Sequence, residues 1–222
     1  MGVFGGDDDG LSSEYISSLA TQVTAERHIL HSSDLIISWV VEILSMDMVP
    51  SVVLLAFAAD ERAVLPSWVK VFDITTKILA AMGVTVIASA GDSGASTIRG
   101  TQDQLKCQYS PLWPATSPLV LSVGVTRLVD GEESSCSKGT GDTITSGGGF
   151  SNLYKRPSWQ VHAIDTYLES LSDAHRHVYS MAGFNITGRG YPDISLIGYN
   201  VVQMVDDELI RTDSSVNYSD GI

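Results

Sequence analysis

Hydrophobic residues recur along this chain with two spacings, and together these spacings predict alternating helices and strands. Between Asp34 and Pro50 the apolar side chains fall on one face of a helix, with Asp34 at the position of an N-terminal cap. The run at 51–57 is apolar without alternation, as expected of a strand buried on both faces. A second helix at 66–82 and a second apolar strand at 84–89 follow.

The order strand, helix, strand predicts a parallel pair, because the connection is far too long for a hairpin. The fold class is therefore α/β. A short helix is expected at 11–20. The later part of the chain predicts, in order, a proline-rich turn (111–118), a strand (119–125), a loop rich in Gly, Ser, Thr and acidic residues (130–149), a helix (158–172), a turn that enters a strand (188–195) and a last strand (199–205).

Composition narrows the classes of function. The chain has 222 residues, of which 44% are hydrophobic, and this suits one domain with a substantial core. Its 26 acidic and 13 basic residues give a net charge of −13, which argues against a nucleic-acid partner. No apolar stretch reaches the roughly 20 residues of a membrane helix. The opening MGVFGGDDDG does not have the pattern of a signal peptide.

Cysteines and histidines give little evidence of a special site. Cys107 and Cys136 are the two cysteines, and they are either a disulfide or two buried thiols. The five histidines lack the spacing of metal ligands, so no metal site is expected from them. Asn185 and Asn217 begin glycosylation acceptor triplets, which matter only in a secreted protein.

The strand at 84–89 ends in the turn Gly91-Asp92-Ser93-Gly94, where glycines let a ligand approach the backbone. GDSG also occurs in the nucleophile loop of trypsin-like proteases, but those are antiparallel barrels with several disulfides. A phosphate site is disfavoured, because the turn is not followed by Lys and Asp92 would repel phosphate. Two alternatives remain: a protonated Asp92 stabilises an oxyanion, or Asp92 accepts backbone N–H bonds in a tight turn.

Four longer motifs change this balance. They are ASAGDSGAS (Ala88–Ser96), PLWPATSPLVLSVGVT (Pro111–Thr126), SGGGFSNLYKRPSWQ (Ser146–Gln160) and GRGYPDISLIGYNVV (Gly188–Val202). Together, and in this order, they resemble the sedolisin, or serine-carboxyl peptidase, family, and its tripeptidyl-peptidase branch in particular. The resemblance covers residues 8–205 and is strongest over 83–202. It implies a subtilisin-like parallel sheet flanked by helices, incomplete at both ends.

The resemblance also implies a mechanism. In the family a serine attacks the peptide bond, a glutamate takes its proton, an aspartate orients the glutamate, and a second aspartate completes the oxyanion hole. Asp92 matches the oxyanion aspartate. Asp8 falls at the base position, Ser12 at the orienting position and Ser215 at the nucleophile position, within Thr-Asp-Ser-Ser where the family has Ser-Gly-Thr-Ser. A shifted frame that uses Glu14 as the base gives Ser18 as its orienter, so neither frame supplies two carboxylates.

Two segments match substrate-binding positions of the family. Ala56, Phe57 and Ala58 replace the usual Ser-Tyr-Gly, and a Cβ in place of the glycine would hinder the approach of a peptide backbone. Ser146, Gly147, Gly148 and Gly149 are expected to lie beside the substrate with their backbone exposed to it.

The resulting prediction is a single partial peptidase domain over 1–222, weakly matched over 1–32 and degenerate over 206–222. The expected activity is peptide hydrolysis at acidic pH, by an endopeptidase or a tripeptidyl-peptidase, weak or absent in this chain because its triad is degraded. The alternatives are a pseudopeptidase that binds a peptide or a partner, and a remnant that does not fold stably. No cofactor is expected here, since the family's calcium site would lie beyond Ile222, and the resemblance implies a lysosomal, vacuolar or secreted location.

Overall fold

A computed structural model of the chain describes residues 1–5, 22, 24–30, 35–99, 106–130, 132–135, 144–198, 201–205 and 208–212. Asp8, Ser12, Cys136, Ser215 and Asn217 lie outside these residues, as do Glu14, Ser18 and the helix predicted at 11–20.

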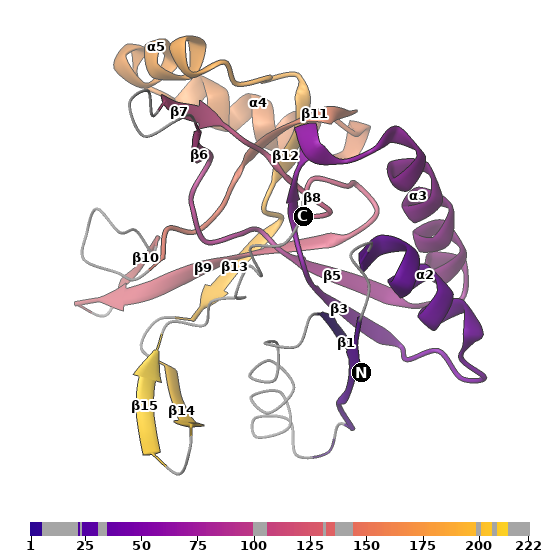
Figure 1. The fold of residues 1–222 in the computed structure, drawn as a ribbon. Helices are drawn as coiled ribbons and strands as arrows, with labels where there is room; N and C mark the ends of the chain where they lie inside the picture. Colours follow the sequence, from indigo (N-terminus) through magenta and orange to yellow (C-terminus); the bar gives the residue numbers. More distant parts are fainter. Residues whose placement is uncertain are drawn as a thin grey trace.

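A mostly parallel sheet forms the centre of the fold (Figure 1). Its strands are β1 (Gly2–Gly5), β2 (Glu26–Ile29), β3 (Val52–Ala56), β5 (Thr85–Ser89), β9 (Leu121–Val129), β10 (Glu132–Ser135) and β13 (Ile194–Ile197). Six of them run parallel in the order β2-β1-β3-β5-β9-β13, and β10 pairs antiparallel with the end of β9.

Short antiparallel pairs and helices surround this sheet. The pairs are β4 (Ala59–Asp60) with β8 (Leu112–Trp113), β6 (Ser96–Arg99) with β7 (Lys106–Tyr109), β11 (Gly149–Lys155) with β12 (Gly188–Tyr191), and β14 (Val201–Val205) with β15 (Glu208–Thr212). The helices are α2 (Leu35–Ser45), α3 (Pro66–Ala81), α4 (Val161–Ser170) and α5 (Asp173–Ala182), with 3-10 turns η1 (Glu61–Ala63) and η3 (Ser158–Gln160). In Figure 1, α2 and α3 lie together on one side, and α4 and α5 lie apart from them near β11 and β12.

The α/β prediction is confirmed, and so is the parallel pairing of β3 with β5. The predicted helices at 34–50, 66–82 and 158–172 correspond to α2, α3 and α4, although α2 ends at Ser45, five residues before Pro50. The prediction that 130–149 is all loop was wrong, because β10 adds to the sheet there. Its sequence, Glu-Glu-Ser-Ser, has low strand propensity, and pairing with β9 is what makes it a strand.

Aromatic rings join the helices to the segment that follows them in the chain. Phe72 of α3 is fully buried, with its ring centroid 5.2 Å from that of Trp39 in α2 and 4.7 Å from that of Trp113 in β8. Such tilted and edge-on pairs add to the stabilisation from apolar burial. This cluster holds α2, α3 and β8 together.

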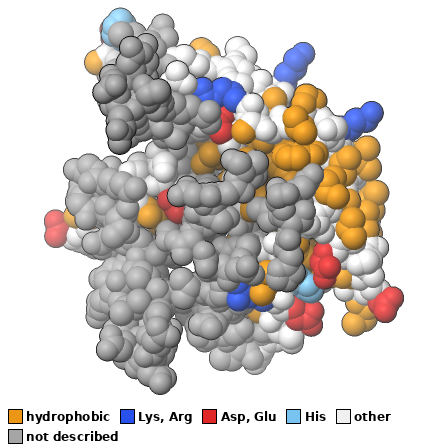
Figure 2. Space-filling view, in the orientation of Figure 1, with side chains coloured by type: hydrophobic (Ala, Val, Ile, Leu, Met, Phe, Trp, Pro, Cys, Tyr) orange, Lys and Arg blue, Asp and Glu red, His pale blue; other side chains and the backbone are white. Residues whose placement is uncertain are grey.

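The outer faces of α2 and α3 keep many apolar side chains in contact with solvent. Figure 2 shows hydrophobic side chains gathered over these helices. Val41 is 63% exposed and Ile74 is 50% exposed. The helices therefore have apolar residues on both sides. Only the side that faces the sheet is buried within this chain.

We predict that Phe72→Ala lowers the free energy of unfolding by about 3–5 kcal/mol, because it leaves a cavity between two tryptophan rings. Ile74→Ala, on the exposed face of the same helix, should cost less than about 1 kcal/mol. Urea unfolding followed by tryptophan fluorescence measures both. Equal losses would contradict this account of the core.

Candidate functional site

The turn after β5 and the glycine run before β11 meet through their backbones. The N–H of Gly147 donates to the carbonyl of Gly91 at 2.6 Å, and the N–H of Thr145 donates to the carbonyl of Asp92 at 2.9 Å. The N–H of Gly94 returns a bond to the carbonyl of Thr145 at 2.9 Å. Two segments predicted from the sequence to share a site are therefore in direct contact at the carboxyl end of β5.

Glycine is required at position 147 because of this contact. A Cβ built there would lie 1.8 Å from the carbonyl oxygen of Ala90 and 3.0 Å from the nitrogen of Gly91. No side chain fits in that space. We expected the glycine run to leave its backbone open to a ligand, and Gly147 is instead buried against the chain's own backbone.

The rest of the run is also tied to its surroundings. Ser146 Oγ accepts a bond from the N–H of Val125 at 2.9 Å, which fixes the run beside β9. Gly148 faces the carbonyl of Tyr191. Gly149 has a φ of 138°, in the region that favours glycine.

Asp92 itself is only 8% exposed, beside these bonds. Gly91, immediately before it, has a φ of 101°, so the turn depends on glycine for its shape. Asp92 is therefore largely buried, in a turn whose backbone is bonded to the glycine run.

The third predicted segment, 56–58, begins with the last residue of β3, the strand that pairs with β5. Because Leu55 pairs with Ala88, the same register brings Ala56 beside Ser89. Ala56 is 3% exposed, while Phe57 and Ala58 are half-buried. All three sequence-predicted segments within the described part of the chain thus lie at the carboxyl end of β3 and β5 or in contact with it.

Sequence reasoning missed Glu61, three residues after Ala58. Its side chain is 2% exposed and accepts bonds from Ser151 Oγ and from the N–H of Asn152, the latter at 2.7 Å. Burial raises the pKa of Glu61, although hydrogen bonds from Ser151 and from the backbone of β11 oppose that rise. The only sequence signal was an acidic residue between a buried strand and the proline that begins α3.

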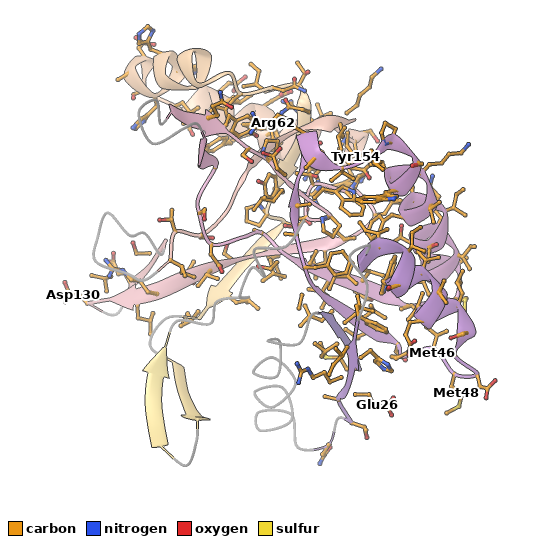
Figure 3. All side chains as sticks on the ribbon, in the orientation of Figure 1. Glu26, Met46, Met48, Arg62, Asp130 and Tyr154 are labelled. Carbon is orange, nitrogen blue, oxygen red and sulfur yellow. The ribbon has the colours of Figure 1, made fainter. Side chains whose placement is uncertain are left out.

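Asp60, next to Glu61, titrates in the opposite direction. Burial alone would raise its pKa, but hydrogen bonds from Arg62 and Ser110 outweigh burial and hold the pKa at about 2. Arg62 contacts both carboxylate oxygens, at 3.0 and 2.7 Å, and Ser110 Oγ donates at 2.5 Å. Figure 3 labels Arg62 of η1 and Tyr154 of β11.

A buried ion pair lies at the start of β13. Arg189 is fully buried, and its guanidinium lies 2.5 Å from Asp193 Oδ2, which also accepts the N–H of Ser122 at 2.8 Å. Burial lowers the pKa of Arg189, and Asp193 opposes that effect. The pair attaches β13 to β9.

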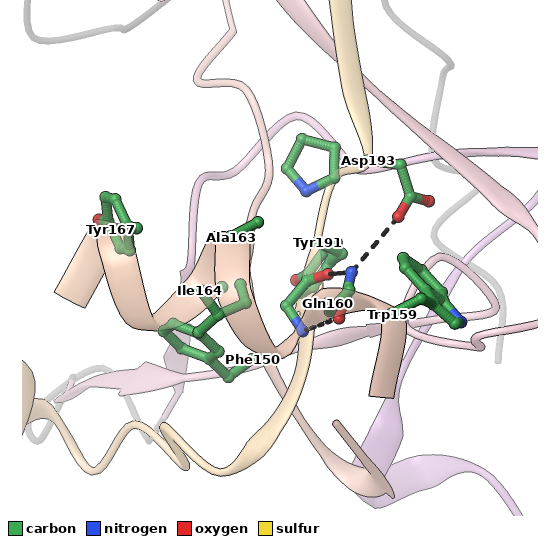
Figure 4. A pocket seen from close by; sticks show the side chains of 11 residues that line it. Phe150, Trp159, Gln160, Ala163, Ile164, Tyr167, Tyr191 and Asp193 are labelled. Carbon is green, nitrogen blue, oxygen red and sulfur yellow. Dashed lines mark hydrogen bonds between the residues drawn. The ribbon is translucent and has the colours of Figure 1, made fainter. Parts of the chain in front are cut away.

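Beside this ion pair is a pocket of about 400 Å³ (Figure 4). Its walls are mainly aromatic and aliphatic, from Phe150, Trp159, Ile164 and Tyr167. Gln160 closes one side by donating to the carbonyl of Gly190 at 2.7 Å and accepting the N–H of Gly190 at 3.1 Å. The pocket is therefore a preformed apolar space.

The remaining predicted positions stay predictions. Cys107 lies in β7 and Cys136 lies outside the described residues, so their pairing is open. Asn185 is half-buried, and its Nδ2, the atom that would carry a glycan, donates to the carbonyl of Ser151 at 3.0 Å. Among the residues that the structure describes, no three His, Cys, Asp or Glu side chains cluster to hold a metal ion. No helix in the described ranges is long and apolar enough to cross a membrane.

The chain is similar in sequence to several tripeptidyl-peptidases. Tripeptidyl-peptidase 1 of Dictyostelium discoideum is 33% identical over 210 residues, which cover 92% of this chain and 32% of that protein. The Bos taurus protein of the same name is 29% identical over 209 residues, covering 89% of this chain and 34% of that protein. This chain thus spans about a third of the length of these curated relatives. No protein-family model matches it.

The fold is similar to that of a solved structure, Pseudomonas sedolisin, a serine-carboxyl proteinase, complexed with two molecules of pseudo-iodotyrostatin. The superposition has a TM-score of 0.63 and 17% sequence identity, and it covers 97% of this chain and 70% of the other. At this identity the likeness bears on the fold alone, and it agrees with the parallel sheet and flanking helices described above.

We predict that Gly147→Ala lowers the free energy of unfolding by about 3 kcal/mol, because its Cβ would overlap the carbonyl of Ala90. Gly183→Ala is the matched control. Gly183 has a φ of 75° and open space around it, so its replacement should show only backbone strain of about 1 kcal/mol. Urea unfolding measures both, and a loss at 147 no larger than that at 183 would contradict the close approach.

A second prediction concerns Asp60. Because its folded pKa of about 2 lies below the ordinary 3.8, its stabilisation is present above pH 3.8 and is lost as the pH falls through about 2. Asp60→Asn should therefore lower the free energy of unfolding by about 2 kcal/mol from pH 7 down to about 4, and by progressively less below that. Asp47→Asn, at an exposed acid after α2, should change it by less than about 0.5 kcal/mol. A difference for Asp60→Asn that grows toward pH 2 would exclude this assignment.

Proposed function

Since the chain belongs to the sedolisin, or serine-carboxyl peptidase, family, we propose that its segments 56–58, 91–93 and 146–149 form a groove for an extended peptide that is bound at acidic pH. The observation that supports this most directly is the backbone contact between the Asp92 turn and the glycine run. It brings a carboxyl group to the carboxyl end of parallel strands, where α/β folds bind their ligands.

Asp92 has the role of an oxyanion stabiliser in this proposal. The carbonyl oxygen of a peptide becomes negative when it is attacked, and a donor aimed at it lowers the barrier. A carboxyl group can donate such a bond only when protonated, so the proposal requires acidic conditions. A lysosomal, vacuolar or secreted compartment that is acidic would provide them.

The rest of the mechanism depends on positions where the chain departs from the family. Asp8, Ser12 and Ser215 stand where the family has glutamate, aspartate and the nucleophilic serine of Ser-Gly-Thr-Ser. An aspartate base is one methylene shorter than glutamate, and a serine cannot orient it with a negative charge. Loss of triad members costs several orders of magnitude in rate. We therefore propose weak or absent hydrolysis by this chain.

The second candidate function is a pseudopeptidase that binds a peptide and does not cleave it. The same departures favour it, because they affect proton transfer and leave the three groove segments in place. Turnover distinguishes the two candidates, since both predict binding.

The test uses the full chain with an unblocked tripeptide amide at pH 4 and pH 7. Binding at pH 4 is expected for both candidates. Where turnover is measurable, Asp92→Ala should lower kcat about 10²- to 10³-fold. Asp92→Asn should lose less and should gain relative activity at pH 7, because an amide donates at every pH. Binding without turnover identifies the pseudopeptidase, and a chain that neither binds nor cleaves overturns the proposal.

A further inference from the structure

The two walls of the proposed groove belong to different sheets. Segment 56–58 continues β3 of the central sheet, whereas 146–149 leads into β11, which pairs with β12. Among the described strands, β3 and β11 are not neighbours in a backbone ladder. The bond from Gly147 to Gly91 fixes the start of segment 146–149 beside β5, but no described backbone ladder joins segment 56–58 to β11 where that segment ends.

Glu61 makes this connection. It follows segment 56–58 on the same stretch of chain, and its buried carboxylate reaches Ser151 and Asn152, directly after Phe150 on the opposite wall. One oxygen accepts the Ser151 hydroxyl, and the other accepts the N–H of Asn152 at 2.7 Å.

The partners of Glu61 require an acceptor at both oxygens. Ser151 Oγ already accepts the N–H groups of Leu153, at 3.0 Å, and of Tyr154, at 2.8 Å, so its own proton is left to donate to Glu61. Glutamine at this position would turn an NH₂ group toward one of these donors. A substitution that keeps size and removes the carboxylate should therefore break the connection.

The turn that carries Glu61 is held firmly on its other side. The N–H of Glu61 donates to the carbonyl of Pro111 at 3.0 Å, and Asp60 accepts the Ser110 hydroxyl. Tyr109, in the same stretch of chain, bonds through its hydroxyl to the N–H and the carbonyl of Phe150. The start of β11 is thus bonded to the 109–111 stretch, which also holds the turn that carries Glu61.

We infer that Glu61 is a positioning residue that holds the start of β11, and with it the Gly148–Gly149 end of segment 146–149, at a fixed distance from segment 56–58, and so sets the width of the peptide groove at that end. The inference rests on the proposed function, because the groove is the one proposed there. Glu61 acts through the backbone of β11 and does not itself contact the peptide.

The test compares wild type, Glu61→Gln and the control Asp73→Asn at a temperature where each is folded. Asp73 is another half-buried acid that reaches β11, accepting the Tyr154 hydroxyl at 2.8 Å, and it lies outside the connection between the walls. Amide hydrogen exchange at Asn152 and Leu153 should become at least about tenfold faster in Glu61→Gln and stay unchanged in Asp73→Asn. Amides of α3 report the stability of the core in all three proteins.

The second measurement is the affinity for an unblocked tripeptide amide at pH 5. Because β11 is held less firmly in Glu61→Gln, this variant should raise Kd by up to about tenfold, the full value of one lost hydrogen bond, while Asp73→Asn leaves Kd unchanged. A merely structural role would lower stability without changing the Kd of the folded molecules.

The outcomes separate this inference from the proposed function. If the wild type binds no peptide, the proposed function fails, and exchange at Asn152 and Leu153 still decides whether Glu61 holds β11. If the wild type binds peptide and Glu61→Gln binds it equally well, the inference fails while the proposed function stands. Unchanged exchange in Glu61→Gln also overturns the inference.

Discussion

The close approach of Gly147 to the carbonyl of Ala90 is the constraint on which the site depends. A Cβ at position 147 would lie 1.8 Å from that oxygen, so the backbones of the two segments are in contact with nothing between them. The N–H of Gly147 then bonds to Gly91 at 2.6 Å. Because β5 is fixed in the middle of the sheet, this contact fixes the start of the second wall relative to Asp92.

Charged side chains, most of them buried or half-buried, add connections to those that the backbone ladders make. Glu61 holds β11, Asp60 and Arg62 hold the turn beside β8, and Arg189 with Asp193 attaches β13 to β9. Removing charges from water is unfavourable, so such groups persist only where several hydrogen bonds compensate. In this fold they occur where strands outside the sheet, or at its edge, must be held against it. These side chains fix the positions of the strands as well as stabilising the fold.

The central elements could be predicted from the sequence because their signals are local. The apolar run at 51–57 and the helical spacing at 66–82 give β3 and α3 directly. β1, with the sequence Gly-Val-Phe-Gly, and the acidic β10 become strands through pairing with distant partners, which no local pattern records. Glu61 was missed for the same reason: its importance comes from Ser151 and Asn152, some ninety residues away.

Asp60 at the end of β4 and Glu61 at the start of η1 are neighbours whose pKa values are shifted in opposite directions. Hydrogen bonds keep Asp60 ionised down to about pH 2, so its pair with Arg62 survives any mildly acidic compartment. Burial raises the pKa of Glu61, and the hydrogen bonds that Glu61 accepts from Ser151 and Asn152 oppose that rise. A folded pKa above the unfolded value stabilises the protein below the unfolded pKa, and this stabilisation is lost as the pH rises through the folded pKa. The hydrogen bonds of Asp60 thus stabilise the fold above pH 3.8, and that contribution is lost as the pH falls toward 2, whereas burial at Glu61 acts in the opposite direction.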